Sequence, residues 1–99
     1  MRILGIDPGS RLCGYGVVDL VTGQRPRYVE CGVIQLPEAR PLPFRLRLLH
    51  EELDEVIREL RPQEMSLESI FHGKNAQSAL RLGYARGVVM LLCEQRGLP

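Results

Sequence analysis

The sequence predicts a single α/β domain, with a mixed four-strand sheet and two main helices. Three short segments rich in β-branched residues open the chain, and turn signals join them closely. An amphipathic stretch with helical spacing, a fourth apolar segment and a second helical stretch follow in that order. With 99 residues, the chain has room for one domain at most. We therefore expect a three-strand antiparallel meander, extended by a parallel fourth strand that follows a helix.

The first three strands follow from the turn residues that separate the apolar segments. Pro8-Gly9-Ser10 gives a turn signal after the first segment, and Thr22-Gly23 closes a hairpin after the second. Gly14 and Gly16 lie inside the second segment, where they allow another backbone to approach closely. The expected strands cover residues 2–7, 13–20 and 27–36. Connections this short indicate antiparallel pairing.

A loop, a helix and a fourth strand are expected next. Residues 37–43 hold three of the seven prolines, and apolar residues then recur at helical spacing over residues 44–60. Arg61-Pro62 ends this helix, and residues 64–70 predict the fourth strand. A strand–helix–strand order favours parallel placement beside the first strand. This placement brings the ends of the first and fourth strands together.

The second helix is expected from about Asn75 to Arg96, with Asn75 as a good N-cap. Its apolar residues lie on more than one face. Ala79, Gly83 and Gly87 form a stripe of small residues at four-residue spacing, although each glycine costs roughly 1 kcal/mol of helix propensity relative to alanine. The stripe suits close packing against either the sheet or another helix, and the spacing leaves both alternatives open.

Composition is that of an ordinary globular protein. Hydrophobic residues make up 44% and charged residues 25% of the sequence. No run approaches the roughly 20 apolar residues of a membrane span, and no secretory signal begins the chain. We therefore expect a cytoplasmic protein. The net charge is +1, but residues 48–68 carry seven acids against two arginines, whereas both flanking regions are basic and suit an anionic partner.

The three cysteines do not indicate a cross-linked or metal-bound framework. Their number is odd, and no Cys-x-x-Cys spacing occurs. Cys13, Cys31 and Cys93 all lie in apolar stretches, which predicts buried free thiols rather than catalytic nucleophiles.

Two carboxylates mark the predicted site. The first apolar segment ends at Asp7, and the fourth carries Glu68. If the two strands are parallel neighbours, both acids meet at one edge of the sheet. Magnesium prefers oxygen ligands and takes one or two carboxylates together with water and substrate phosphate. The alternatives are a turn-forming role for Asp7 and a solvent-facing strand position for Glu68.

These segments resemble the RuvC family of bacterial Holliday-junction resolvases. The resemblance rests on Ile6 to Arg11, on Gly14 to Val18, and on the long pattern from Leu67 to Gly87. It covers essentially the whole chain. The family continues well beyond the point that matches Pro99, so we expect this chain to be an N-terminal portion that lacks the C-terminal part of the fold.

The resemblance implies a ribonuclease-H-like fold and a homodimeric, Mg²⁺-dependent endonuclease, for which Mn²⁺ is a plausible substitute. Such an enzyme nicks two opposed strands of a four-way DNA junction symmetrically, in concert with the RuvA–RuvB branch-migration machine. Asp7 and Glu68 match the first two of the family's four catalytic acidic positions. The helix over residues 75–96 matches the dimerisation helix.

The resemblance also implies DNA contacts near the site. Phe71 matches the aromatic residue that stacks on an unpaired base, although it could also belong to the core. The other predicted DNA contacts are Arg11, Lys74, Asn75, Arg81 and Arg86. A solvated helix face is the alternative for the charged members of this set.

Two other functions stay open from the sequence. One is a catalytically incomplete junction-binding or dimerisation module, because two carboxylates alone leave a two-metal site short of ligands. On this hypothesis the chain binds Mg²⁺ weakly and cleaves poorly or not at all. The other is a nucleotide-binding domain in the style of actin and Hsp70, in which a loop after a strand-borne Asp approaches phosphates.

Overall fold

The computed structural model describes residues 1–9, 11–67 and 76–99, and the side chains of the last range from residue 80 onward. The elements in chain order are β1 (Arg2–Pro8), β2 (Leu12–Asp19), β3 (Arg27–Gln35), α1 (Leu42–Leu60), β4 (Glu64–Leu67) and α2 (Ala76–Gln95). The first three strands match the sequence prediction to within one residue at each end. Residues 68–70, predicted as the end of the fourth strand, lie outside the described residues.

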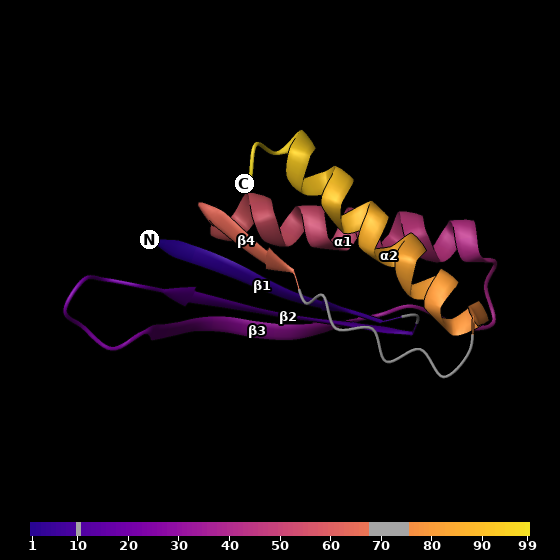
Figure 1. Cartoon of the computed structure of the whole chain (residues 1–99), viewed down its shortest axis with the longest axis horizontal. Coiled ribbons are helices and arrows are strands. Elements are labelled where there is room, and N and C mark those ends of the chain that lie inside the picture. Colours follow the sequence, from indigo (N-terminus) through magenta and orange to yellow (C-terminus); the bar gives the residue numbers. More distant parts are fainter. Residues whose placement is uncertain (10, 68–75) are drawn as a thin grey trace.

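The four strands form one mixed sheet in the order β3-β2-β1-β4. β2 pairs antiparallel with both β1 and β3, whereas β4 pairs parallel with β1 (Figure 1). The predicted meander and the parallel fourth strand are therefore confirmed. α1 makes the connection between β3 and β4.

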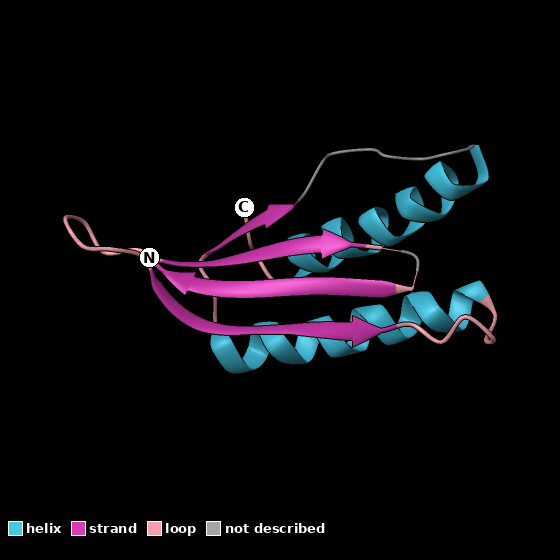
Figure 2. Ribbon diagram, turned by 90° about the horizontal axis from the view of Figure 1, so that it is seen from below, coloured by secondary structure: helices cyan, strands magenta, loops and turns pink. Residues whose placement is uncertain are grey.

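Both helices cover the same face of the sheet (Figures 1 and 2). Side chains alternate between the two faces of a strand, and in β1 the alternate residues Leu4, Ile6 and Pro8 are buried. The core between the sheet and the helices consists of Leu4, Ile6, Cys13, Val17, Ile34, Leu36, Leu49, Leu53, Ile57, Ala85, Val89, Leu92 and Cys93. The opposite face of the sheet, which we call the open face, has no helix on it among the described residues.

α1 begins at Leu42, two residues before the predicted start. Pro41 is the N-cap and Pro43 lies in the first turn, where the fixed φ of proline and its missing N–H are tolerated. The helix buries Leu49, Leu53 and Ile57 at four-residue spacing. It ends at Leu60, and its C-cap Arg61 adopts the left-handed conformation with φ of 51°.

α2 packs beside α1 and against β1. From residue 80 onward, its buried residues are Ala85, Val89, Leu92 and Cys93. The predicted N-cap of this helix, Asn75, lies outside the described residues. Among the described residues, no helix combines the length and the apolar character that spanning a bilayer requires.

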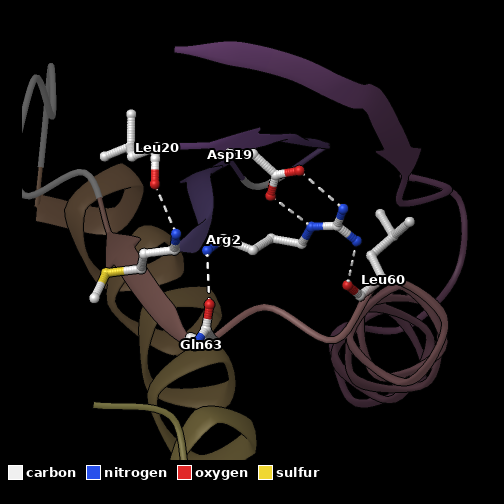
Figure 3. A network of polar contacts seen from close by, with 6 residues as sticks. Arg2, Asp19, Leu20, Leu60 and Gln63 are labelled. Carbon is white, nitrogen blue, oxygen red and sulfur yellow. Dashed lines mark hydrogen bonds and ion pairs between the residues drawn. The ribbon is translucent and has the colours of Figure 1, made fainter. Parts of the chain in front are cut away.

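A polar network holds the amino end of β1 (Figure 3). The Arg2 side chain donates two hydrogen bonds to the Asp19 carboxylate, at 2.8 and 3.0 Å, and a third to the Leu60 carbonyl at 2.8 Å. The Arg2 backbone N–H donates to Gln63 Oε1 at 3.0 Å, and the N-terminal amino group donates to the Leu20 carbonyl. One end of β1 is thus fastened to β2, to the end of α1 and to the segment before β4.

Candidate functional site

Asp7 lies at the carboxyl end of β1, on the open face of the sheet. Its neighbours Ile6 and Pro8 are buried against the helices, whereas Asp7 is exposed. Because successive side chains of a strand point to opposite faces, the Asp7 carboxylate is directed away from the core. The first predicted site residue is therefore accessible to a ligand.

A shallow hollow of about 240 Å³ lies beside Asp7. The residues that line it come from three neighbouring strands: Gly5, Ile6, Asp7, Gly14, Tyr15, Gly16 and Ser66. Three of these seven residues are glycines, so much of the floor is bare backbone. A floor without side chains lets a polymer backbone approach the sheet closely.

Packing in the fold does not require glycine on the open face. A Cβ atom at Gly14 or Gly16 would meet nothing within 4 Å. On the helix side of the same sheet the situation is reversed, because a Cβ atom at Gly32 would lie 2.6 Å from Tyr15 Oη. The space above Gly14 and Gly16 is therefore open for a ligand, whereas Gly32 makes room for the Tyr15 ring.

β4 runs beside β1 in parallel register, with Ile3 opposite Glu64 and Ile6 opposite Leu67. Asp7 and Glu68 are the residues that follow Ile6 and Leu67 in the sequence. The prediction that these two strands end side by side is confirmed. Glu68 itself lies outside the described residues, so its meeting with Asp7 stays a prediction. Within the described residues, no group of three or more His, Cys, Asp or Glu side chains is placed to hold a metal ion.

The thiol nearest to Asp7 is not a nucleophile. Burial, and after it the negative charge of Asp7, raise the pKa of Cys13 to about 11. Burial also raises the pKa of Cys93. Both thiols therefore stay protonated at neutral pH.

The burial prediction is wrong for Cys31, which is exposed. This residue pairs with Gly16 across the β2–β3 ladder and shares its open face. The Tyr28 hydroxyl donates a hydrogen bond to Cys31 Sγ at 2.9 Å. An apolar strand sequence predicts burial on both faces, but only one face of this sheet is covered.

The predicted DNA contacts fall into two groups. Arg11, at the start of β2, is exposed and forms an ion pair with Glu38 at 3.4 Å. Arg81 is exposed on α2, and Arg86 is partly buried there. The remaining predicted contacts, Phe71, Lys74 and Asn75, lie outside the described residues.

The outward face of α2 is apolar and carries the two glycines of the predicted stripe. Gly83 and Gly87 are exposed, and a Cβ atom at either would meet nothing within 4 Å. Leu80, Tyr84 and Leu91 are exposed beside them. Of the two alternatives for the stripe, packing against the sheet is therefore wrong for these glycines, and the face remains open for another helix.

Sequence reasoning missed an aromatic–arginine cluster at the start of α1. The Arg40 guanidinium lies 4.0 Å from the centroid of the Phe44 ring, and that of Arg47 lies 5.4 Å from it. The three-residue spacing of Phe44 and Arg47 is that of neighbours on a helix surface and lay within the predicted helix. The contact of Arg40 could not be predicted in this way, because Arg40 precedes the helix in a segment predicted as a proline-rich loop.

The acidic residues form a separate surface. Glu30, Glu52, Glu55 and Glu59 line a hollow of about 340 Å³ between β3 and α1. The Tyr15 hydroxyl donates to Glu30 there, and burial followed by this hydrogen bond raises the pKa of Tyr15. Three acids of the block seen in the sequence, Glu52, Glu55 and Glu59, thus lie with Glu30 at the β3 edge.

Comparison with known proteins decides the family. The family model described as crossover junction endodeoxyribonuclease RuvC matches residues 3–99. The chain belongs to the RuvC family. The RuvC protein of Magnetococcus marinus is 48% identical over 99 residues, and that of Xanthobacter autotrophicus is 52% identical over 99 residues. Both matches cover the whole of this chain, but 54% and 58% of the two relatives. The chain thus spans little more than half the length of these curated relatives.

A solved RuvC structure has the same fold. The Thermus thermophilus RuvC in complex with a Holliday junction substrate superposes with a TM-score of 0.92 at 27% identity. The match covers 100% of this chain and 63% of that chain. The predicted ribonuclease-H-like class and the resemblance to the N-terminal portion of RuvC are confirmed. Because the chain belongs to the RuvC family, the actin-like nucleotide-binding alternative is set aside.

Proposed function

We propose that this chain provides the N-terminal part of a metal-dependent, structure-specific endonuclease that resolves Holliday junctions. The observation that supports it most is the RuvC match over residues 3–99, joined to an accessible Asp7 beside a bare backbone floor. The proposed reaction is symmetric nicking of two opposed strands during DNA recombination and repair. Cooperation with RuvA–RuvB and a cytoplasmic location belong to the same proposal.

The donor set at this edge of the sheet fits a hard divalent cation. Asp7 offers carboxylate oxygens, and Glu68 is the second proposed ligand at the end of the neighbouring strand. Mg²⁺ suits such oxygen ligands and keeps waters of its own, and Mn²⁺ is the plausible substitute. When bound, the ions would activate water and stabilise the leaving 3′ oxygen.

The chain's own residues would position the DNA strand. The glycine floor admits the sugar–phosphate backbone next to Asp7, because no side chain stands above Gly14 and Gly16. Arg11 would contact a flanking phosphate, with Lys74, Asn75, Arg81 and Arg86 as further contacts. Phe71 would stack on an unpaired base, which is typically worth roughly 1–3 kcal/mol.

A second copy of the chain would dock on the outward face of α2. Gly83 and Gly87 let the backbone of a partner helix come close, and Leu80, Tyr84 and Leu91 add apolar surface that is otherwise exposed. A two-fold pair of helices would place two Asp7 sites on one junction. Two such sites are what symmetric nicking needs.

The second candidate function is a junction-binding or dimerisation module that is catalytically incomplete. Asp7 is the one acid lining the described hollow, and the metal site proposed in this chain has two carboxylates. Such a module binds Mg²⁺ weakly and nicks poorly or not at all. It still recognises the junction.

The deciding experiment uses a labelled four-way junction and a linear duplex of matched sequence, each in Mg²⁺ and in Ca²⁺. Junction-selective nicking in Mg²⁺, lost in Asp7→Asn and retained in the exposed-site control Glu94→Gln, is the expected result for the endonuclease. Selective binding without nicking identifies the incomplete module. Equal affinity for junction and duplex contradicts both.

A further inference from the structure

Two arginines share one aromatic ring at the start of α1. Arg40 lies 4.0 Å and Arg47 5.4 Å from the centroid of the Phe44 ring, within the range of cation–π attraction. Among the described residues, Arg40 has no carboxylate within ion-pair distance. Arg47 has a long contact of 3.7 Å with Glu51, and both side chains are more than half exposed. We call Arg40, Phe44 and Arg47 the arginine–phenylalanine cluster.

The cluster lies toward the end of the sheet that carries Asp7. β1, β2 and β3 are neighbours, and adjacent strands lie about 4.8 Å apart, so the end of β3 is about 10 Å from the end of β1. The Leu36 N–H donates to the Arg11 carbonyl at 2.7 Å, which fastens the segment before α1 to the segment after β1. The cluster therefore lies at the same end of the molecule as the Asp7 hollow, on the side of the sheet that the helices cover.

Helix stability does not explain arginines at this position. The positive end of a helix dipole is its N-terminus, where acidic residues are stabilising and basic residues are not. α1 has no acid in its first turn and no side-chain cap at Pro41. Its acids instead lie in the following turns, at Glu51, Glu52 and Asp54 among others. An external anion would be attracted both by the arginines and by the uncapped N–H groups.

We propose that the arginine–phenylalanine cluster binds the sugar–phosphate backbone of a DNA arm that flanks the strand at Asp7. The Phe44 ring holds the guanidinium groups against one surface and leaves their N–H groups exposed. Each planar guanidinium then donates two parallel hydrogen bonds to the oxygens of a phosphate. Phe44 is a positioning residue, because it acts on the phosphate through the two arginines. The proposal rests on the proposed junction-binding function.

The test measures junction affinity in Ca²⁺ over a range of salt concentrations. The double variant Arg40→Gln/Arg47→Gln is compared with Arg25→Gln/Arg27→Gln, which removes the same charge near the opposite end of the sheet. Loss of two phosphate contacts lowers the slope of log affinity against log salt by about 2 and weakens binding about tenfold at near-physiological salt. The control double variant is expected to keep the wild-type slope.

A second pair of variants tests the contribution of the Phe44 ring alone. Phe44→Leu keeps an apolar side chain but removes the cation–π platform, and it is expected to weaken binding about three-fold without changing the melting temperature. Phe44→Tyr restores the wild-type affinity. A lowered melting temperature in Phe44→Leu, or no rescue by Phe44→Tyr, overturns the positioning role.

The possible failures are distinguishable. If the wild type binds the junction and the cluster variant binds it equally well, or if both double variants lose affinity equally, the cluster proposal is wrong while junction binding stands. If the wild type shows no affinity for DNA, the proposed function fails and the cluster proposal fails with it.

Discussion

Asp7 lies directly opposite Gly14 in the antiparallel β1–β2 ladder. Opposite residues of such a pair have their side chains on the same face, with Cβ atoms roughly 5 Å apart. The residue that would most readily cover Asp7 from β2 therefore has no side chain. An acid at the end of a central strand is left open to a ligand on that side.

A side chain at Gly14 should block the site without harming the fold. We expect Gly14→Val to melt within about 3 °C of the wild type, because the new Cβ atom meets open space and valine suits a strand. Junction binding in Ca²⁺ and nicking in Mg²⁺ should both fall, by up to about 100-fold, because the strand is displaced from Asp7. Gly32→Ala is the opposite control, since its Cβ atom collides with Tyr15, and it should lower the melting temperature. Full activity in Gly14→Val would contradict the glycine-floor interpretation.

The outward face of α2 should control the oligomeric state. Leu91 is 55% exposed in the single chain, and Leu91→Glu should convert the proposed dimer into a monomer because it introduces a charge into its apolar interface. Light scattering coupled to size-exclusion chromatography measures the change. Val21→Glu, at a residue that is 51% exposed in the β2–β3 hairpin, should leave the dimer intact. Dissociation by both variants, or by neither, would argue against this face.

The ion pair between Asp54 of α1 and Arg96, which follows α2, should make the free energy of unfolding depend on pH in the acidic range. Asp54 accepts hydrogen bonds from Arg96 Nε and Nη2, and this pairing lowers the pKa of Asp54. Because the pKa in the folded state lies below the unfolded value of about 3.9, the contribution is full above that pH and is lost as pH falls through the folded pKa. We expect Asp54→Asn to melt about 3 °C below the wild type at neutral pH and to lose this part of the acid dependence. Melting curves from neutral pH to pH 2 measure both effects, and a constant difference at all pH values would refute the linkage.

Thiol labelling should distinguish the three cysteines. Cys31 is exposed, whereas Cys13 and Cys93 are buried with raised pKa values. A small thiol reagent should therefore modify one cysteine rapidly in the native chain and all three after unfolding. Cys31→Ser should abolish the rapid phase. Rapid labelling of Cys13 would mean that the packing of β2 against the helices opens readily.

The strands and their pairing could be predicted because local signals agree. Pro8-Gly9-Ser10 and Thr22-Gly23 predict the turns, and leucines at helical spacing predict α1. The parallel position of β4 followed from the strand–helix–strand order. Asp7 was singled out because it ends an apolar strand, where a turn-forming role was the alternative, and its part in a metal site stays a prediction.

Features that depend on what covers a surface could not be predicted. Cys31 sits in an apolar strand, and only the placement of both helices on one face leaves it exposed. The direction of Gly83 and Gly87 depends in the same way on which stripe of α2 meets the core. The contact of Arg40 with Phe44 depends on α1 beginning at Leu42, inside the expected loop, rather than after it.

The central position of β1 has a consequence for the chain while it is being made. β1 completes its pairing with β2 when 19 residues are available, whereas its other edge waits for β4, which ends at residue 67. At typical synthesis rates of about 5–20 residues per second, the ribosome needs roughly 2–10 s to supply the difference. During that interval the strand that carries Asp7 presents unpaired N–H and C=O groups, which can pair with another nascent chain. Yield of soluble protein should therefore improve when fewer chains are in synthesis at one time, or when a chaperone covers this edge until β4 has been made.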